Sequence, residues 1–343
     1  MATTYMIRKK DFMFSPLKPG DTIGIFSPSK PASVIAKARY ERGKARLQHL
    51  GFIIKEGILT GKTDYYRSGT PKERANELNL LLRDPDLKLI LPAMGGTNSN
   101  SMLPYLDYVA LLENPKMLMG ISDVTAILLA MYAKTSIPVF YGPSVASTFG
   151  EFPPFVDLTE HYFKQLFMKK CQPPYKMPIP PIWTDDRINW LDKTSEKTQH
   201  KNAWITVKEG VAEGRLIGGN INTMCGFIGT PYFPAIQAGD ILLLEDTSKT
   251  IDIVEKNFAM LKLHGFFDKA SAIILGKHEQ YDDLGTGRKP YDVLIEQLED
   301  RQLPILADVD CSHTHPLHAM PLGLRVCVDA SKKDIHFIEH WLS

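Results

Sequence analysis

Three residues that lie far apart in the sequence have the side-chain types of the catalytic groups of a serine hydrolase. Ser122 and Glu245 each follow an apolar run, and His313 begins a segment of six residues that holds three of the ten histidines of the chain. A serine becomes a nucleophile when a base takes its proton, and the base needs a third group to orient it. The order Ser, Glu, His is one that convergent triads use, although order alone identifies nothing.

The sequence around Ser122 allows two interpretations. Residues 117–121 read as a buried strand, and apolar residues then recur at helical spacing at Val124, Ile127, Leu128 and Met131. Ser122 would lie in the strand-to-helix turn, where a hydroxyl is exposed and backbone N–H groups face the atom that it attacks. Ser122 or Asp123 could instead only cap the helix. From this stretch alone the cap is favoured, because valine replaces the second glycine of G-x-S-x-G.

The acid also has a structural alternative. Glu245 directly follows the apolar run 241–244, as an active-site carboxylate at a strand end should. It could equally be a charge near a helix N-terminus, because good helix caps follow it at Asp246, Thr247 and Ser248.

The histidine segment could be a polar loop or a metal site. His313 and His315 alternate in an extended segment and would share one face, with Asp308 and Asp310 nearby. We rank a metal below a triad, because the segment lacks a spaced motif such as H-E-x-x-H. We expect neither a metal nor another cofactor.

The elements that position these residues predict an α/β fold. In the first half, short apolar runs alternate with helical patterns, which indicates a doubly wound, mostly parallel sheet. Small residues cluster where these runs end, at Ser27, Gly95, Gly96 and Ser122. Ligands of open α/β sheets bind at the carboxyl ends of strands, so we expect the site at this edge.

Composition changes along the chain predict three segments. Residues 1–168 form the α/β domain with the nucleophile, and 169–209, rich in proline and tryptophan, form a linker and substrate loop. Residues 210–343 carry the acid and the base. Strands outnumber helices in this last segment, which predicts a smaller α+β or β-barrel-like domain.

Bulk composition argues against several classes of protein. The 40 basic and 39 acidic residues leave a formal charge of +1, which favours neither nucleic acid nor a membrane surface as a partner. No apolar stretch approaches the ~20 residues of a membrane span. The start of the chain lacks the apolar core of a signal peptide, and the four cysteines form no C-x-x-C pair, so we expect reduced thiols and a cytoplasmic location.

Six motifs resemble, in order and along nearly the whole chain, those of the serine LD-carboxypeptidase family. They are GGTNSNSMLPYLDY, GISDVTA, GRLIGGNINT, LLLEDTSK, LGKHEQYDD and DCSHTHPLHAMPLG, at 95–108, 120–126, 214–223, 242–249, 275–283 and 310–323. The GGTNSNS variant and the WTDD loop are typical of the microcin C immunity branch rather than the murein-recycling branch.

The resemblance implies roles for individual residues. Ser122 matches the family nucleophile and Glu245 the acid. His313 matches the base of a G-H-T-x-P motif in which serine here replaces glycine, and His315 stands in a variable position. Backbone N–H groups of Asp123 and of the Gly95-Gly96 turn would stabilise the oxyanion.

Substrate contacts follow less directly from the resemblance. Family members cut an amide beside a free carboxylate, for which Asn220 and Lys249 are candidate ligands. The immunity branch acts on a modified adenylate, so an aromatic side chain could stack on the base. Trp183 is our choice and Trp190 the reserve, although a loop tryptophan is as often a packing anchor. The family also implies a homodimer.

Four functions remain open. The first is a cytoplasmic serine peptidase that hydrolyses an amide bond in aminoacyl- or peptidyl-nucleotide antibiotics of the microcin C type, giving self-immunity or detoxification. The second is a murein LD-carboxypeptidase of cell-wall recycling. A non-catalytic nucleotide-binding protein is the third, and the presence of all three triad residues argues against it. A metal-dependent hydrolase ranks last.

Overall fold

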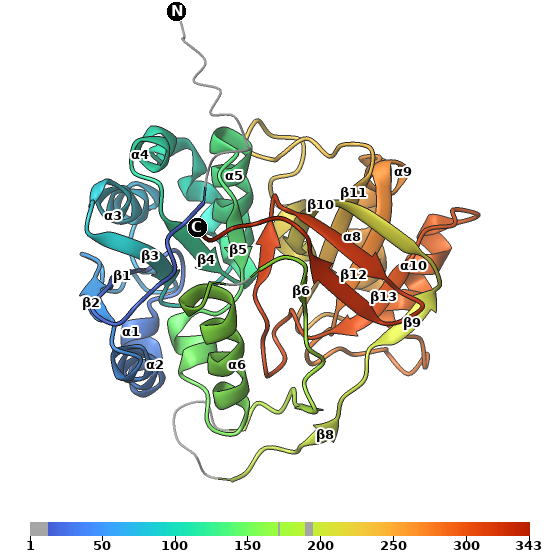
Figure 1. The fold of residues 1–343 in the computed structure, drawn as a ribbon, viewed down its shortest axis with the longest axis horizontal. Coiled ribbons are helices and arrows are strands. Elements are labelled where there is room, and N and C mark those ends of the chain that lie inside the picture. Colours follow the sequence, from blue (N-terminus) through green and yellow to red (C-terminus); the bar gives the residue numbers. More distant parts are fainter. Residues whose placement is uncertain (1–12, 171, 189–194) are drawn as a thin grey trace, which may run out of the picture.

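Two β-sheets, each with its own helices, lie side by side in a computed structural model that describes residues 13–170, 172–188 and 195–343 (Figure 1). The first sheet has the order β14-β5-β4-β3-β1-β2. Its strands are β1 (Thr22–Phe26), β2 (Ile53–Glu56), β3 (Leu87–Pro92), β4 (Met117–Gly120), β5 (Val139–Tyr141) and β14 (Met320–Leu322). The strands β1 to β5 pair in parallel, and β14 is antiparallel to β5. The predicted mostly parallel sheet is therefore confirmed.

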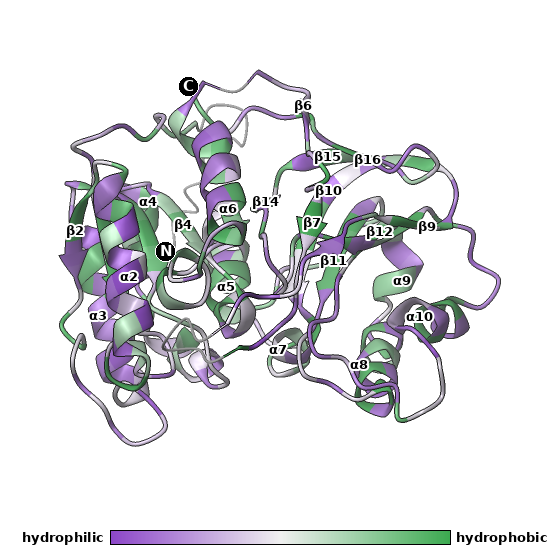
Figure 2. Cartoon of the chain, turned by 90° about the horizontal axis from the view of Figure 1, so that it is seen from below, coloured by the Kyte–Doolittle hydropathy of each residue, from purple (hydrophilic) through white to green (hydrophobic). Residues whose placement is uncertain are grey.

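The helices of the first half connect these strands. They are α1 (Ala32–Ile35), α2 (Lys37–His49), α3 (Pro71–Arg83), α4 (Tyr108–Glu113), α5 (Thr125–Thr135) and α6 (Phe155–Phe163). Short 3-10 or π turns add η1 (Ser99–Tyr105), η2 (Ser122–Val124), η3 (Val145–Phe149) and η4 (Lys164–Met168). In Figure 2 the exposed helix α2 is largely hydrophilic, whereas α5 consists mostly of buried apolar residues and contacts both β5 and β10.

The second sheet is mixed and has the order β6-β16-β15-β10-β11-β12-β13-β9. Its strands are β6 (Tyr175–Lys176), β9 (Ile205–Lys208), β10 (Val211–Asn220), β11 (Asp240–Glu245), β12 (Ala270–Gly276), β13 (Ile305–Val309), β15 (Arg325–Asp329) and β16 (Asp334–Phe337). The central strands β10 to β13 are parallel. Its helices are α7 (Ile221–Cys225), α8 (Ile251–Leu263), α9 (Phe266–Lys269) and α10 (Pro290–Leu298). A separate, sheet-rich C-terminal domain is confirmed, and the sheet is open rather than barrel-like, because β6 and β9 stand at its two ends.

Strands cross between the predicted segments. From the last segment β14 joins the first sheet, while β6 and β9 of the predicted linker join the second. The linker also holds a two-stranded ribbon of β7 (Ile182–Trp183) and β8 (His200–Lys201). The boundaries at 168 and 209 stay a prediction.

The described residues add two observations about chain class. No helix among them is both long and apolar enough to cross a membrane. Cys225, Cys311 and Cys327 are free thiols, and Cys171 lies outside the described residues.

Candidate active site

Ser122 lies in the turn between β4 and α5, as predicted, with a strained backbone. Its φ is +67°, in the left-handed region that costs free energy for any residue with a Cβ. The Thr125 hydroxyl donates to the Ser122 carbonyl oxygen at 2.6 Å and stabilises this turn. The caps of η2 and α5 are Ile121 and Val124, and neither makes a side-chain cap hydrogen bond. The capping interpretation of Ser122 is therefore wrong, and the turn has the geometry of a nucleophile elbow.

The glycine turn packs directly against this elbow. A Cβ on Gly96 would lie 2.1 Å from the Ser29 hydroxyl oxygen and would force Ser29 to move, and one on Gly95 would lie 3.1 Å from the Cβ of Ser122, which is a tight contact. The buried Asp123 carboxylate fixes the turn by accepting from the N–H groups of Asn98 and Ser99 at 3.1 and 3.0 Å. These contacts bring together the three residues predicted to form the oxyanion site.

Glu245 and His313, the predicted acid and base, lie within hydrogen-bonding distance of each other. His313 Nδ1 lies 2.7 Å from Glu245 Oε2. The second oxygen of Glu245, Oε1, accepts from the Tyr141 hydroxyl at 2.5 Å and from Asn220 Nδ2 at 2.9 Å. Because Glu245 is fully buried and both its oxygens have partners, its carboxylate has one fixed orientation. The helix-terminus alternative does not apply, because the N-cap of α8 is Thr250.

The two partners shift each other's ionisation. Burial would raise the pKa of Glu245, but the charge of His313 and hydrogen bonds from His313, Tyr141 and Asn220 hold it below its usual range. Burial would lower the pKa of His313, but the charge and hydrogen bond of Glu245, with charges on Glu279 and Asp246, raise it above the usual value. Both shifts favour an ion pair that forms when the imidazole gains a proton.

Sequence reasoning missed Tyr141, which connects the nucleophile turn to the acid. Its hydroxyl accepts from the Ser122 N–H at 3.1 Å while it donates to Glu245. Tyr141 is the last residue of β5 and pairs with Gly120 at the end of β4. A position at the end of a strand, on the sheet edge where the site was expected, could have identified Tyr141 as a site residue.

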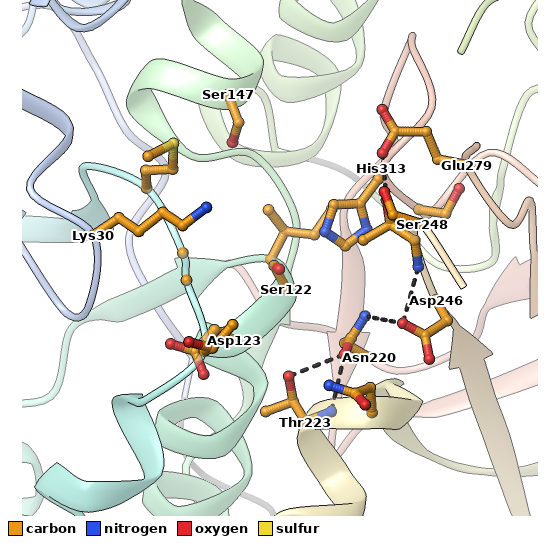
Figure 3. A pocket seen from close by; sticks show the side chains of 18 of the residues that line it. Lys30, Ser122, Asp123, Ser147, Asn220, Thr223, Asp246, Ser248, Glu279 and His313 are labelled. Carbon is orange, nitrogen blue, oxygen red and sulfur yellow. Dashed lines mark hydrogen bonds between the residues drawn. The ribbon is translucent and has the colours of Figure 1, made fainter. Parts of the chain in front are cut away.

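Ser122 and His313 line a pocket of about 630 Å³ between the two sheets (Figure 3). Seven predicted site residues line it, namely Gly95, Gly96, Ser122, Asp123, Asn220, Lys249 and His313. Glu245 lies behind His313 and is not among the lining residues. His313 Nε2, the nitrogen not used by Glu245, is buried and has no hydrogen-bond partner among the described residues. This nitrogen is therefore available for a proton from a group in the pocket.

The two predicted polar ligands of the substrate, Asn220 and Lys249, both line the pocket. The Asn220 amide donates to Glu245 and Asp246 and accepts from the N–H and hydroxyl of Thr223, so its polar atoms already have protein partners.

The candidate stacking tryptophan contacts His200 and Lys277. Its ring, that of Trp183, lies 5.2 Å from the His200 ring and 5.4 Å from Lys277 Nζ, and it is not among the described lining residues. Trp190 lies outside the described residues. A stacking role for either tryptophan stays a prediction.

The pocket wall carries charged side chains that the sequence did not single out. Lys30 points into the pocket from the N-terminal side (Figure 3). On the opposite side Arg187 donates to Glu279 Oε1 at 3.1 Å, and burial together with the charge of Glu245 raises the pKa of Asp246 to about 6. The pocket wall therefore carries both anionic and cationic groups.

The three histidines of the predicted cluster have separate partners. His313 contacts Glu245, His315 lies 3.3 Å from Glu151, and His318 Nε2 lies 3.0 Å from the Tyr175 hydroxyl. Within 13–170, 172–188 and 195–343, no three His, Cys, Asp or Glu side chains are grouped as metal ligands would be.

Two family models match the chain. The LD-carboxypeptidase N-terminal domain matches residues 23–142, and the LD-carboxypeptidase C-terminal domain matches 213–328. The microcin C7 self-immunity protein MccF of Escherichia coli is 48% identical over 340 residues, which cover 98% of this chain and 99% of that protein. The chain belongs to the LD-carboxypeptidase family. It is accordingly an enzyme of the peptidase class.

Other members of the LD-carboxypeptidase family are also similar. A putative carboxypeptidase of Vibrio cholerae is 49% identical over 95% of this chain and 97% of its own length, and a probable murein peptide carboxypeptidase of Bacillus subtilis is 24% identical over 92% and 91%. The solved structure of MccF in complex with aspartyl sulfamoyl adenosine has a TM-score of 0.95 and covers 97% of this chain and 100% of that chain. These similarities confirm the resemblance read from the sequence.

Proposed function

We propose that this enzyme is a serine peptidase that hydrolyses the amide bond between an aminoacyl or peptidyl group and a modified nucleotide, as in antibiotics of the microcin C type. The observation that carries the proposal is the His313–Glu245 pair at 2.7 Å, whose imidazole lines the same pocket as the strained Ser122. Self-immunity or detoxification, a cytoplasmic location and a homodimer belong to the same proposal.

In the proposed reaction His313 Nε2 takes the proton of the Ser122 hydroxyl as its oxygen attacks the carbonyl carbon of the substrate. Glu245 holds the imidazole by Nδ1 and stabilises the imidazolium that forms. His313 then gives its proton to the leaving nitrogen, the C–N bond breaks, and an ester on Ser122 remains. Water, deprotonated by His313, attacks this ester and releases the acid product.

Charge on the carbonyl oxygen would be stabilised by backbone donors. The first N–H groups of a helix have no partner within the helix, and Asp123 is the second residue of η2. Its N–H and those of the Gly95-Gly96 turn lie beside the nucleophile, where each donor is worth roughly 3 kcal/mol in comparable sites.

Sequence similarity supports the nucleotide substrate over the murein peptide. MccF, solved with aspartyl sulfamoyl adenosine and with glutamyl sulfamoyl guanosine, is twice as identical to this chain as the murein peptide carboxypeptidase. One MccF structure is described as an active-site mutant with alanine in place of a serine, an asparagine and a lysine. Ser122, Asn220 and Lys249 supply the same three residue types to the present pocket.

The decisive experiment offers two substrates to wild type and to Ser122→Ala. Aspartyl sulfamoyl adenosine and an L,D-murein tetrapeptide are each incubated with both proteins, with and without chelator, and the products are identified by mass spectrometry. We expect wild type to release aspartate from the adenosine compound, with or without chelator. Activity in Ser122→Ala should fall by a factor on the order of 10⁶, because the covalent route is lost.

Each of the other outcomes of this experiment would favour one of the alternative functions. Cleavage of the tetrapeptide alone would assign the enzyme to murein recycling, and activity that survives Ser122→Ala would remove the triad. Binding of the adenosine compound without any cleavage would favour the non-catalytic alternative. Loss of activity in chelator would favour a metal hydrolase.

A further inference from the structure

Glu151 is a buried carboxylate behind the pocket wall, in contact with two lining residues, Lys197 and His315, and has no part in the proposed triad. Its Oε2 lies 2.5 Å from Arg39 Nη2, 2.9 Å from Lys197 Nζ and 3.3 Å from His315 Nε2. Its Oε1 accepts from the N–H of Phe152 at 2.8 Å. The residue is 1% exposed, so these contacts replace water almost completely.

The contacts of Glu151 join three segments that line the pocket. Arg39 is also buried and donates to the carbonyl oxygens of Ala146 and Ser147 at 2.7 and 3.0 Å, which ties α2 to η3. Ser147 points into the pocket in Figure 3. Lys197 precedes β8 on the ribbon, and His315 follows the base His313 by two residues. One carboxylate therefore touches the N-terminal domain, the ribbon and the base segment.

A second set of contacts joins the β7–β8 ribbon to the segment that carries His313 and His315. The backbone N–H and C=O of His315 pair with those of Thr184, at 2.9 and 2.8 Å, just after β7. Asp186 Oδ2 accepts from the Thr198 N–H at 2.6 Å and so holds the two described arms of the ribbon together. The ribbon and the base segment thus contact each other at Thr184 and again through Glu151.

The network depends on the charge of Glu151. Burial opposes its ionisation, but His315, Arg39 and Lys197 together hold the pKa of Glu151 well below the usual range. Burial lowers the pKa of His315 to about 4, although the charge of Glu151 opposes this shift. The Arg39 guanidinium and the Lys197 ammonium group both contact this one carboxylate, so removing its charge would weaken both contacts.

We propose that Glu151 is a positioning residue with two separable arms: through Lys197 it fixes the ribbon at the pocket wall, and through His315 it fixes the segment that carries His313. The proposal rests on the proposed function for the role of His313. The Lys197 arm acts on substrate binding, and the His315 arm acts on the chemical step.

The test separates KM from kcat. Lys197→Met should raise KM about tenfold and leave kcat close to wild type, because one charged contact of the ribbon is lost. His315→Leu should lower kcat by about tenfold to a hundredfold with little change in KM, because a displaced base is poorly aligned for proton transfer. Glu151→Gln keeps the shape of the side chain and an acceptor for Phe152, and it should both raise KM and lower kcat. Lys197→Arg keeps the positive charge and should have a KM close to that of wild type.

The matched control is Asp240→Asn. Asp240 is a buried partner of Arg215, with an N–O distance of 2.6 Å, and lies at the opposite end of β11 from Glu245. The Asp240→Asn variant should have a lower melting temperature, as Glu151→Gln should, but unchanged kcat and KM. The proposal is overturned if Glu151→Gln behaves like Asp240→Asn, or if both arms change kcat and KM in the same proportion.

A measurement without substrate keeps this test distinct from the proposed function. Trypsin can cut the described ribbon after Arg187, Lys197 and Lys201. Glu151→Gln should speed cleavage after Arg187 and Lys201 and weaken the low-field NMR signal of the His313 Nδ1 proton, whereas Asp240→Asn should change neither. If wild type hydrolyses neither substrate, the proposed function fails. The positioning role is overturned separately if trypsin cleaves Glu151→Gln at the wild-type rate and the His313 Nδ1 proton signal is unchanged.

Discussion

At the scale of single residues, the protonation of His313 controls the proposed reaction. The imidazole must be neutral to accept the Ser122 proton, and its environment favours the charged form. Burial would lower the pKa of His313, but the charge and hydrogen bond of Glu245, and the charges of Glu279 and Asp246, raise it. The neutral form of His313, which can accept a proton, therefore becomes the major form at a higher pH than for an ordinary histidine.

We expect kcat/KM to rise with pH through a midpoint above about 6.5, the ordinary pKa of histidine. In Glu245→Gln burial remains but the neighbouring charge is gone, so the midpoint should move to lower pH. The same change should reduce kcat by a factor on the order of 10⁴, because the imidazole tautomer is no longer held. A pH–rate profile of both proteins measures the shift.

The control for this profile is Asp246→Asn. Burial and the charge of Glu245 raise the pKa of Asp246 to about 6, so this carboxyl could also produce an acid limb. The limb should persist in Asp246→Asn with a small shift to lower pH. Its disappearance there, or an unmoved midpoint in Glu245→Gln, would show that His313 is not the titrating base.

At the scale of elements, the turn between β4 and α5 places the Ser122 side chain at the pocket at a cost in stability. The φ of +67° at Ser122 is unfavourable for a residue with a Cβ, and contacts of its neighbours hold it there. The packing of Gly95 against Ser122 adds a second constraint from another strand end.

Replacing Ser122 by glycine should therefore stabilise the fold while it abolishes hydrolysis. Glycine adopts positive φ without a Cβ penalty of about 1–2 kcal/mol, although it loses some of this gain to the entropy of the unfolded chain. We expect Ser122→Gly to unfold in urea with a free energy about 0.5–1 kcal/mol higher than Ser122→Ala, which keeps the Cβ. Equal stabilities of the two variants would mean that the turn is not strained.

At the scale of the whole molecule, the site exists only where two sheets meet. Ser122 and Tyr141 follow strands of the first sheet, whereas Glu245 ends a strand of the second and His313 follows β13. The sheets are not independent, because β14 of the C-terminal segment covers the edge of β5. All three residues of β5, Val139 to Tyr141, are buried.

Separated halves should consequently fail to fold alone. Expressed by itself, 1–168 lacks β14 and exposes the apolar edge of β5, so we expect it mainly in the insoluble fraction. Co-expression with 169–343, which contains β6, β9 and β14, should recover soluble protein and hydrolysis. A soluble 1–168 fragment that unfolds cooperatively would contradict this expectation.

The sequence by itself determined the local features of the site. Apolar runs that end in small or charged residues predicted the strand ends at Ser122 and Glu245, and the alternation of strands with helices predicted a parallel sheet. These are properties of short stretches, which periodicity and turn chemistry report directly. The same stretches carried the family resemblance and therefore the order of the triad.

Only the tertiary structure decided which distant residues touch. The Tyr141–Glu245 and Arg39–Glu151 contacts join residues 104 and 112 positions apart, and β14 crosses to the other sheet. A pattern of apolar residues states which face of an element is buried, but not which polar side chain meets it across the interface. For that reason the sequence predicted the acid and the base, whereas the Tyr141 hydroxyl and the Glu151 network required the packing of the two sheets.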